Sequence, residues 1–167
     1  AKDHTTHDHL QRVQTYAMEL ATELGLSFSE KEALRAASLL HDIGKLAVPE
    51  HIISKPGRLT PEEFEKMKIH PVIGAEILER VRFPYPVVPI VRAHHEKWDG
   101  TGYPYGLAGL AIPIGARILS VVDCLDALAS DVEASSEATR KQFVRIRKEV
   151  EEYIREARQS IWDLRSP

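Results

Sequence analysis

The sequence predicts an all-α fold, and three observations carry this prediction. Apolar residues recur at helical spacing in nearly every segment of the chain. Signals for helix starts and stops separate these segments, and no segment alternates apolar and polar residues as a strand would. With 167 residues, 43% of them hydrophobic and 28% charged, the chain can bury one hydrophobic core and has an ordinary globular composition.

The first two predicted helices are delimited by short polar and glycine signals. The first helix carries apolar residues at helical spacing, namely Val13, Tyr16, Ala17, Leu20 and Leu24. Gly25 is expected to end this helix as a C-cap. Ser29 followed by Glu32 predicts a capping box that opens the second helix, which runs to His41-Asp42.

Prolines divide the middle of the chain. Thr60-Pro61 is expected to begin a helix that runs to His70, and Pro71 then starts a further segment. The elements expected after it are a helix that reaches His94-His95, a glycine- and proline-rich surface loop over 99–113 and an apolar helix over 114–129.

After Asp131 the character of the sequence changes. Residues 132–136 are small or polar, and a charged amphipathic helix is expected to follow. Its apolar residues repeat every seven positions, as in a coiled-coil or bundle seam: Phe143, Val150, Ala157 and Leu164. We therefore expect one domain over residues 1–131 and a C-terminal amphipathic helix within 132–167, through which the chain could form a homodimer.

Charge and cysteine content exclude several classes of protein. The net charge of -3 leaves no basic surface that would track a polynucleotide. The single cysteine, Cys124, excludes an internal disulfide and fits a reducing compartment. No apolar run approaches the roughly 20 residues that span a bilayer. These features predict a cytoplasmic protein that binds neither membrane nor polynucleotide.

Histidines and aspartates in short blocks are the most informative feature of the chain. The set comprises His9, His41, Asp42, His70, His94, His95 and Asp123. Imidazole nitrogen and carboxylate oxygen suit divalent Fe, Mn or Zn, and because no cysteine accompanies them in the set, a thiolate structural zinc site is not expected. Seven ligands exceed what one tetrahedral ion uses, so two ions with a shared ligand are expected. Such pairs serve phosphoester hydrolysis, because they activate water and neutralise the attacked phosphate.

Each block alone has a plainer explanation. A lone His-Asp pair is more often a hydrogen-bonded structural dyad, and adjacent histidines often lie on an exposed face. Asp123 is different, because it lies in an apolar helix where no neighbour in sequence neutralises it. Together, blocks at the inner ends of several helices would converge in a bundle core, where carboxylate-histidine metal sites are commonly built.

The blocks also resemble a known family. The matching runs are His41-Asp42-Ile43-Gly44-Lys45, Lys55-Pro56-Gly57, His70-Pro71 with Gly74-Ala75, His94-His95-Glu96, Asp99-Gly100-Thr101-Gly102-Tyr103-Pro104, Ile112-Pro113, Ala116-Arg117-Ile118, and Asp123 with Asp126-Ala127-Leu128. In this order and spacing, residues 6–131 resemble the HD-GYP subgroup of the HD-domain metal-dependent phosphohydrolases.

The resemblance implies an HD-domain helical bundle that hydrolyses the cyclic dinucleotide cyclic di-GMP to pGpG or GMP through a metal-bridging hydroxide. Carried over position by position, the seven residues of the set become metal ligands, with Asp42 as the bridge. Two divalent ions, iron or manganese, are implied, because members with three carry a Glu where this chain has Thr5. Lys45 would hold the phosphate. The loop residues Gly102, Tyr103 and Pro104 would shape the site and contact a signalling partner.

The C-terminal part departs from the family. Where the subgroup continues with a basic, phosphate-contacting run, this chain has Val132, Glu133, Ala134 and Ser135. Within 137–167, the last residues resemble a dimerisation helix of certain bacterial sensor histidine kinases. Two alternatives therefore stand beside the cyclic di-GMP phosphodiesterase: a catalytically weak signalling or interaction module, and a phosphohydrolase for another phosphoester.

Overall fold

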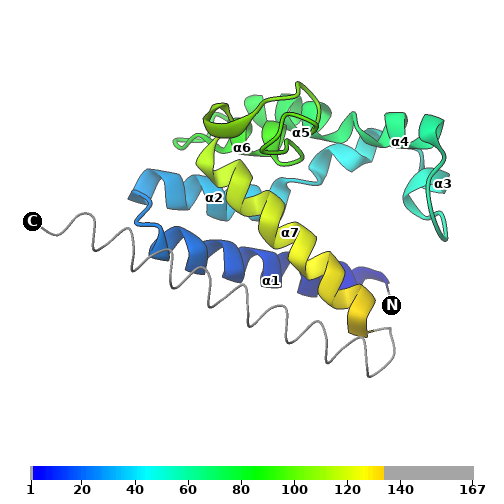
Figure 1. The fold of residues 1–167 in the computed structure, drawn as a ribbon, viewed down its shortest axis with the longest axis horizontal. Coiled ribbons are helices and arrows are strands. Elements are labelled where there is room, and N and C mark those ends of the chain that lie inside the picture. Colours follow the sequence, from blue (N-terminus) through cyan, green and yellow to red (C-terminus); the bar gives the residue numbers. More distant parts are fainter. Residues whose placement is uncertain (1, 134–167) are drawn as a thin grey trace, which may run out of the picture. The chain divides into compact units, whose positions relative to one another are not determined.

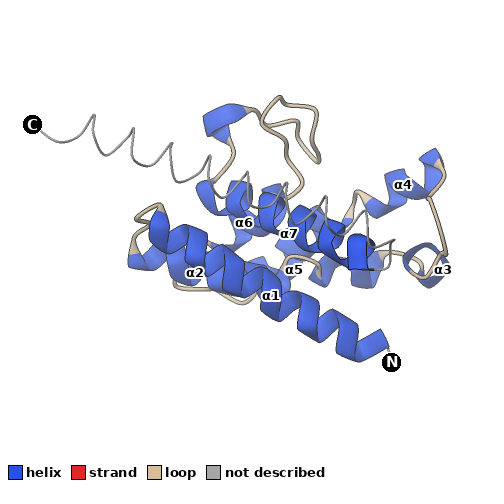
Figure 2. Ribbon diagram, turned by 60° about the horizontal axis from the view of Figure 1, so that its bottom comes forward, coloured by secondary structure: helices blue, strands red, loops and turns tan. Residues whose placement is uncertain are grey.

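Helices form nearly all of the regular structure. The computed structural model describes residues 2–133, and the side chains of residues 7–129. Its elements are α1 (Lys2–Glu23), α2 (Phe28–Leu40), the 3-10 helix η1 (Ile43–Ala47), α3 (Glu50–Ile53), α4 (Pro61–Met67), α5 (His70–Glu79), α6 (Val87–Ala93), the 3-10 helix η2 (Gly109–Ala111) and α7 (Ile114–Glu133). Within 2–133 there is no strand (Figure 2). One isolated bridge joins Asp99 and Ala108. The all-α prediction is confirmed.

The chain divides into two compact units, residues 1–124 and residues 125–167. All seven predicted metal ligands belong to the first unit. Most of the predicted C-terminal amphipathic helix, with its kinase-like stretch, lies outside the described residues, so the boundary expected at residue 131 stays a prediction. None of the described helices combines the length and apolar character needed to cross a bilayer.

The first unit is held together by apolar side chains from several helices. α1 packs on α2, α2 contacts α6, and α5 contacts both α6 and η1 (Figure 1). The buried cluster includes Val13, Ala17 and Ala21 of α1, Ala33, Leu34 and Ala37 of α2, Val87, Ile90 and Val91 of α6, and Ile118, Leu119 and Val122 of α7. Within each helix these residues are one, three or four positions apart, and positions so spaced share one helix face.

The end of α1 follows the glycine signal in the sequence. Gly25 has a φ of +68°, a conformation that glycine adopts without steric cost. Its N–H donates to the Thr22 carbonyl at 3.1 Å, and the N–H of Leu26 donates to the Ala21 carbonyl at 3.0 Å. This pair of bonds is the Schellman motif, so the predicted C-cap is confirmed.

Two predicted helix boundaries were wrong. The capping box of α2 is formed by Ser27 and Glu30, not by Ser29 and Glu32. The same Ser-x-x-Glu spacing occurs twice in this stretch, and the upstream copy caps because the helix already begins at Phe28. The helix that begins after Thr60 ends at Met67 and does not reach His70, which is instead the first residue of α5.

Candidate metal centre

His41 and Asp42 lie where α2 gives way to η1. His41 is the C-cap of α2 and is buried, so its ring is withdrawn from solvent. The C-terminal end of a helix stabilises positive charge, and this favours a cation near the residue. Asp42 is the next residue and the N-cap of η1, so one chain segment supplies two donors of different type.

Three histidines are oriented by the same local device. Each is a donor, through Nδ1–H, to the carbonyl three residues earlier: His41 to Ser38 at 3.0 Å, His70 to Met67 at 2.8 Å and His94 to Val91 at 2.6 Å. This hydrogen bond selects the tautomer in which Nε2 carries a free lone pair. All three rings can therefore offer Nε2 to a metal ion. Histidines that bind a metal usually donate their other ring N–H to a carbonyl or carboxylate, as these three do.

The first cluster of donors comes from α5 and the end of α6. His70 Nε2 and His94 Nε2 lie 3.3 Å apart, and the His95 ring centroid is 4.1 Å from that of His94. One nitrogen of each of the three rings lies within 4.8 Å of the others. We call these three residues the triple-histidine cluster.

The second cluster joins α1, the end of α2 and α7. His9 Nε2 is 3.3 Å and His41 Nε2 is 3.7 Å from Asp123 Oδ1. The ligand atoms of these three residues also lie within 4.8 Å of one another. We call them the His9–His41–Asp123 cluster.

Asp42 lies between the two clusters. Its Oδ2 is 3.6 Å from His41 Nε2, and its Oδ1 is 3.5 Å from His70 Nε2. One carboxylate oxygen therefore faces each cluster. The seven predicted ligands thus meet around one centre, although they come from five separate stretches of the chain.

Burial and charge set the protonation of this centre. Burial lowers the pKa of His94 well below its ordinary value and that of His95 to about 4, with neighbouring histidines adding to the shift. Burial also lowers the pKa of His70. Burial alone would raise the pKa of Asp42 and Asp123, but adjacent histidines, and Lys45 at Asp42, lower both on balance. Neutral imidazoles beside ionised carboxylates are the protonation states that a divalent ion needs.

A close backbone approach brings Asp42 to His70. A Cβ atom on Gly44 would lie 1.9 Å from the His70 carbonyl oxygen and 2.5 Å from the Gly74 nitrogen. Only glycine permits this contact, so Gly44 lets η1 lie directly on α5. The glycine in the His-Asp-Ile-Gly-Lys run is therefore a packing requirement of the centre.

An unpartnered buried nitrogen tests whether the centre fits a metal. Within the described residues, His41 Nε2 is buried and has no hydrogen-bond partner. Carboxylate oxygens of Asp42 and Asp123 stand 3.6 and 3.7 Å away, too far for a hydrogen bond. A buried polar atom left this way is costly, and a cation between the nitrogen and the two carboxylates would satisfy all three groups. The donor set fits divalent Fe, Mn or Zn.

Lys45 and the Gly102-Tyr103-Pro104 loop lie beside the donors. Lys45 Nζ is 2.6 Å from Asp42 Oδ2, and the two side chains are 38% and 31% exposed, so solvent reaches this ion pair. The Tyr103 ring stacks on the His95 ring with centroids 4.8 Å apart. The loop therefore contacts the triple-histidine cluster.

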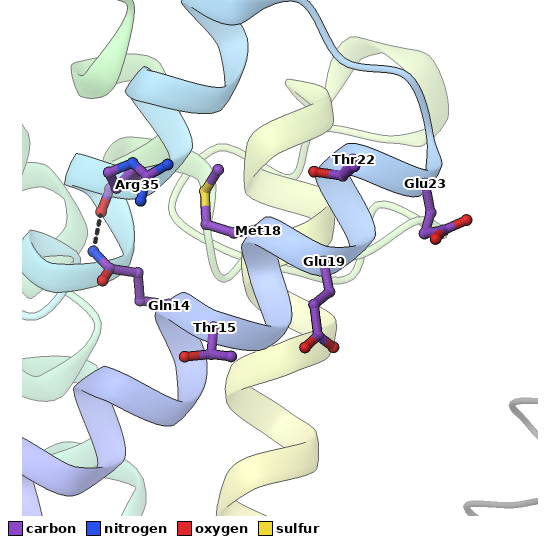
Figure 3. Close-up of a pocket in the computed structure, with 7 residues that line it drawn as sticks. All are labelled: Gln14, Thr15, Met18, Glu19, Thr22, Glu23 and Arg35. Atoms are coloured by element: carbon purple, nitrogen blue, oxygen red, sulfur yellow. Dashed lines mark hydrogen bonds between the residues drawn. The ribbon is translucent and has the colours of Figure 1, made fainter.

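A hollow of about 490 Å³ elsewhere on the first unit has different chemistry. It is lined by α1 residues from Gln14 to Glu23 and by Arg35 of α2 (Figure 3). Gln14 Nε2 donates to the Arg35 carbonyl at 3.1 Å across its edge. None of the seven predicted ligands lines it, and it holds no group of converging histidines. The candidate site is the metal centre and not this hollow.

Sequence reasoning assigned no role to Glu96. Its side chain is only 3% exposed, and it accepts backbone N–H groups from the loop that carries Tyr103. The available signal was a charged residue directly after two histidines at the end of an apolar helix.

The prediction of two metal ions instead of three depends on Thr5. The side chain of Thr5 lies outside the described residues, so this number stays a prediction.

Comparison with protein families finds one described as HD domain, which matches residues 2–155. A cyclic di-GMP phosphodiesterase of Thermotoga maritima is 45% identical over 131 residues, which cover 77% of this chain and 36% of the relative. The 3'3'-cGAMP-specific phosphodiesterase 2 of Vibrio cholerae is 44% identical over 132 residues, with 78% and 25% covered. The chain thus spans about a third of these relatives, or less.

Among solved structures, an HDG"Y"P protein from Bdellovibrio bacteriovorus is similar with a TM-score of 0.62 and 30% sequence identity. The likeness covers 72% of this chain and 40% of that one.

Proposed function

We propose that this chain, which belongs to the HD-domain family and to its HD-GYP subgroup, is a metal-dependent phosphodiesterase that hydrolyses cyclic di-GMP. The observation that carries the proposal is the position of Asp42, with one oxygen facing each donor cluster. The names of the relatives supply the substrate class, a cyclic dinucleotide.

Seven residues would hold two ions. The triple-histidine cluster would bind one and the His9–His41–Asp123 cluster the other, with Asp42 shared. Iron or manganese is proposed, because nitrogen and oxygen donors without thiolate suit these ions. When bound, two such ions supply Lewis acidity that activates a water and neutralises a phosphate.

The protein's own residues do the positioning. The buried imidazole rings are already oriented by backbone carbonyls, so they can offer Nε2 without reorganisation. The carboxylates of Asp42 and Asp123 would balance the positive charge of the bound ions. Lys45 supplies an ammonium group at the solvent edge, where an incoming phosphate would arrive. The ion pair with Asp42 would hold the Lys45 ammonium in place until the ammonium donates a hydrogen bond to an oxygen of the incoming phosphate.

Hydrolysis of defined substrates tests the proposal. Manganese- or iron-loaded protein is incubated with cyclic di-GMP, with 3'3'-cGAMP and with a generic phosphodiester, and products are separated by chromatography. We expect pGpG or GMP from cyclic di-GMP, and no turnover by Asp42→Asn. Asp8→Asn is the matched control, because Asp8 is an exposed α1 carboxylate next to His9. Turnover of only 3'3'-cGAMP or the generic ester would reassign the substrate.

One observation favours a second candidate, a signalling or interaction module. Three large apolar side chains around the Gly102-Tyr103-Pro104 loop are exposed: Trp98 by 62%, Tyr105 by 58% and Leu110 by 82%. Such a group suits contact with a protein partner. The loss of the basic run at 132–135 points the same way, since it removes phosphate contacts. Metal-loaded protein that turns over none of the three substrates would support this candidate, and light scattering would show whether it is a homodimer.

A further inference from the structure

Glu96 is a buried carboxylate that is not one of the seven predicted ligands. It directly follows His95 at the end of the α6 segment and is 3% exposed. Its Oε1 accepts the N–H of Tyr105 at 2.7 Å, and its Oε2 accepts the N–H of Leu107 at 3.0 Å. Both carboxylate oxygens are thus used to hold the backbone of the loop. A buried carboxylate is tolerated only with such partners.

The loop is also held by a close backbone contact. A Cβ atom on Gly102 would lie 2.3 Å from the Lys97 nitrogen and 2.5 Å from Glu96 Cα, so the loop lies directly on the Glu96–Lys97 backbone. The N–H of Tyr103 donates to the His95 carbonyl at 3.2 Å. These contacts fix where the Tyr103 side chain leaves the loop.

The Tyr103 ring then contacts His95. The two rings are stacked, with an angle of 28° between their planes, and Phe64 of α4 meets Tyr103 edge-on at 6.0 Å. His95 differs from the other members of the triple-histidine cluster, because no described residue makes a hydrogen bond to its ring. His70 and His94 are oriented by backbone carbonyls. For His95, the stacked Tyr103 ring takes the place of that bond.

We propose that Glu96 is a positioning residue: it holds the loop so that Tyr103 fixes the ring of His95 for metal binding. The chain of contacts runs from the Glu96 carboxylate through the Tyr105 and Leu107 amides to the loop, and from the Tyr103 ring to the imidazole. The inference rests on the proposed metal binding and is independent of the substrate. It gives the Gly-Tyr-Pro run a role inside the protein as well as at its surface.

The metal-free protein gives a first test. A stacked tyrosine ring shifts the NMR signals of the His95 ring protons, so Tyr103→Ala should move these signals. Glu96→Gln should move them in the same direction, because its amide NH₂ would face one of the two N–H donors that a carboxylate accepts. Glu76→Gln, an exposed position of α5, should leave them unchanged. His95 signals that are the same in Glu96→Gln and wild type would overturn the proposal.

Manganese affinity, measured by calorimetry, gives the second test. Glu96→Gln and Tyr103→Ala should each weaken binding by about 10-fold, the lower end of the effect of groups that orient metal ligands. The double variant should bind no more weakly than either single variant, because both act through His95. Tyr103→Phe should keep wild-type affinity, since it keeps the stacked ring. Additive losses, or equal losses in Tyr103→Phe and Tyr103→Ala, would refute the proposal.

These two readouts separate the proposal from the proposed function. A wild-type protein that binds no manganese would contradict the metal centre, while the NMR signals of His95 would still decide whether Glu96 positions the ring. Circular dichroism confirms that each variant is folded. If Glu96→Gln does not fold, the Tyr103→Phe and Tyr103→Ala pair tests the contact on which the proposal depends, because Tyr103 is partly exposed and is not part of the buried core. Equal manganese affinities in this pair would overturn the proposal.

Discussion

At the scale of the residue, the neutral imidazoles of the centre are explained by burial. Charging a ring inside the protein costs solvation, and a second positive ring nearby adds repulsion. His94 and His95 experience both effects, and this lowers their pKa values. The same burial that would make a charged ring costly leaves a lone pair ready for a metal ion.

This burial predicts acid sensitivity in the metal-free protein. The folded pKa of His95, about 4, lies below the ordinary 6.5 that the unfolded chain retains, so the unfolded state takes up protons first as the pH falls. The free energy of unfolding of the metal-free protein is therefore highest above pH 6.5, and it falls progressively between pH 6.5 and 4. Melting temperatures measured with EDTA should fall across this window. His95→Gln should flatten the slope and the exposed His51→Gln should not; a flat wild-type profile would contradict the prediction.

Lys45 can be tested separately from the metal ligands. Lys45→Gln should keep both ions but lower kcat by about 100-fold, the usual effect of removing one donor that stabilises transition-state charge. Steady-state kinetics and metal content measured together check this. Lys66→Gln is the matched control, because Lys66 is an exposed lysine of α4. Unchanged kcat in Lys45→Gln would show that Lys45 only balances the charge of Asp42.

At the scale of the element, packing between η1 and α5 decides whether the two donor clusters meet. Gly44→Ala should lower the free energy of unfolding by about 3 kcal/mol, because its Cβ would overlap the backbone of His70. Gly57→Ala is the control: its φ of +102° carries strain, but nothing lies within 4 Å of the added atom. It should cost about 1 kcal/mol. Equal losses in urea denaturation would contradict the close-packing account.

The start of α2 offers a comparison between two serines. Ser27→Ala should lower the free energy of unfolding by about 1 kcal/mol, because Ser27 Oγ accepts the N–H of Glu30 at 3.3 Å in the capping box. Ser29→Ala should change it by less than about 0.5 kcal/mol, since Ser29 is exposed and does not cap. Thermal or urea unfolding measures both. The reverse order would show that the helix begins two residues later in solution.

Local signals predicted these helices well and their boundaries less well. Gly25 marks the end of α1 and Thr60-Pro61 marks the start of α4. Each signal is unambiguous, because the conformation that it favours is needed at that position alone. Ser27 and Ser29 each begin a Ser-x-x-Glu run, so this pattern alone could not predict which of the two serines caps α2. His70 sits before Pro71, which is compatible with either a helix end or a helix start, so the sequence alone could not place it.

Local sequence patterns could not predict the contacts between distant segments of the chain. That seven donors would gather was expected from their number and type, and the structure places them together. That Asp42 faces both clusters through a glycine contact, and that Tyr103 covers His95, depends on how η1, α5 and the loop pack. Metal binding by the seven residues, and the phosphate-holding role of Lys45, stay predictions.

At the scale of the whole molecule, the HD-domain match extends over residues 2–155, and the chain spans about a third of its curated relatives or less. The centre lies entirely within residues 1–124. Assembly through the C-terminal segment and partner contact through the loop are separate proposals, since neither is needed to bring the seven donors together.

A crystal structure of the manganese-loaded protein, with anomalous scattering recorded at the manganese edge, tests the central claim most directly. We predict two anomalous peaks, one among His70, His94 and His95 and one among His9, His41 and Asp123, with Asp42 in contact with both. A single peak, or peaks away from Asp42, would contradict the account.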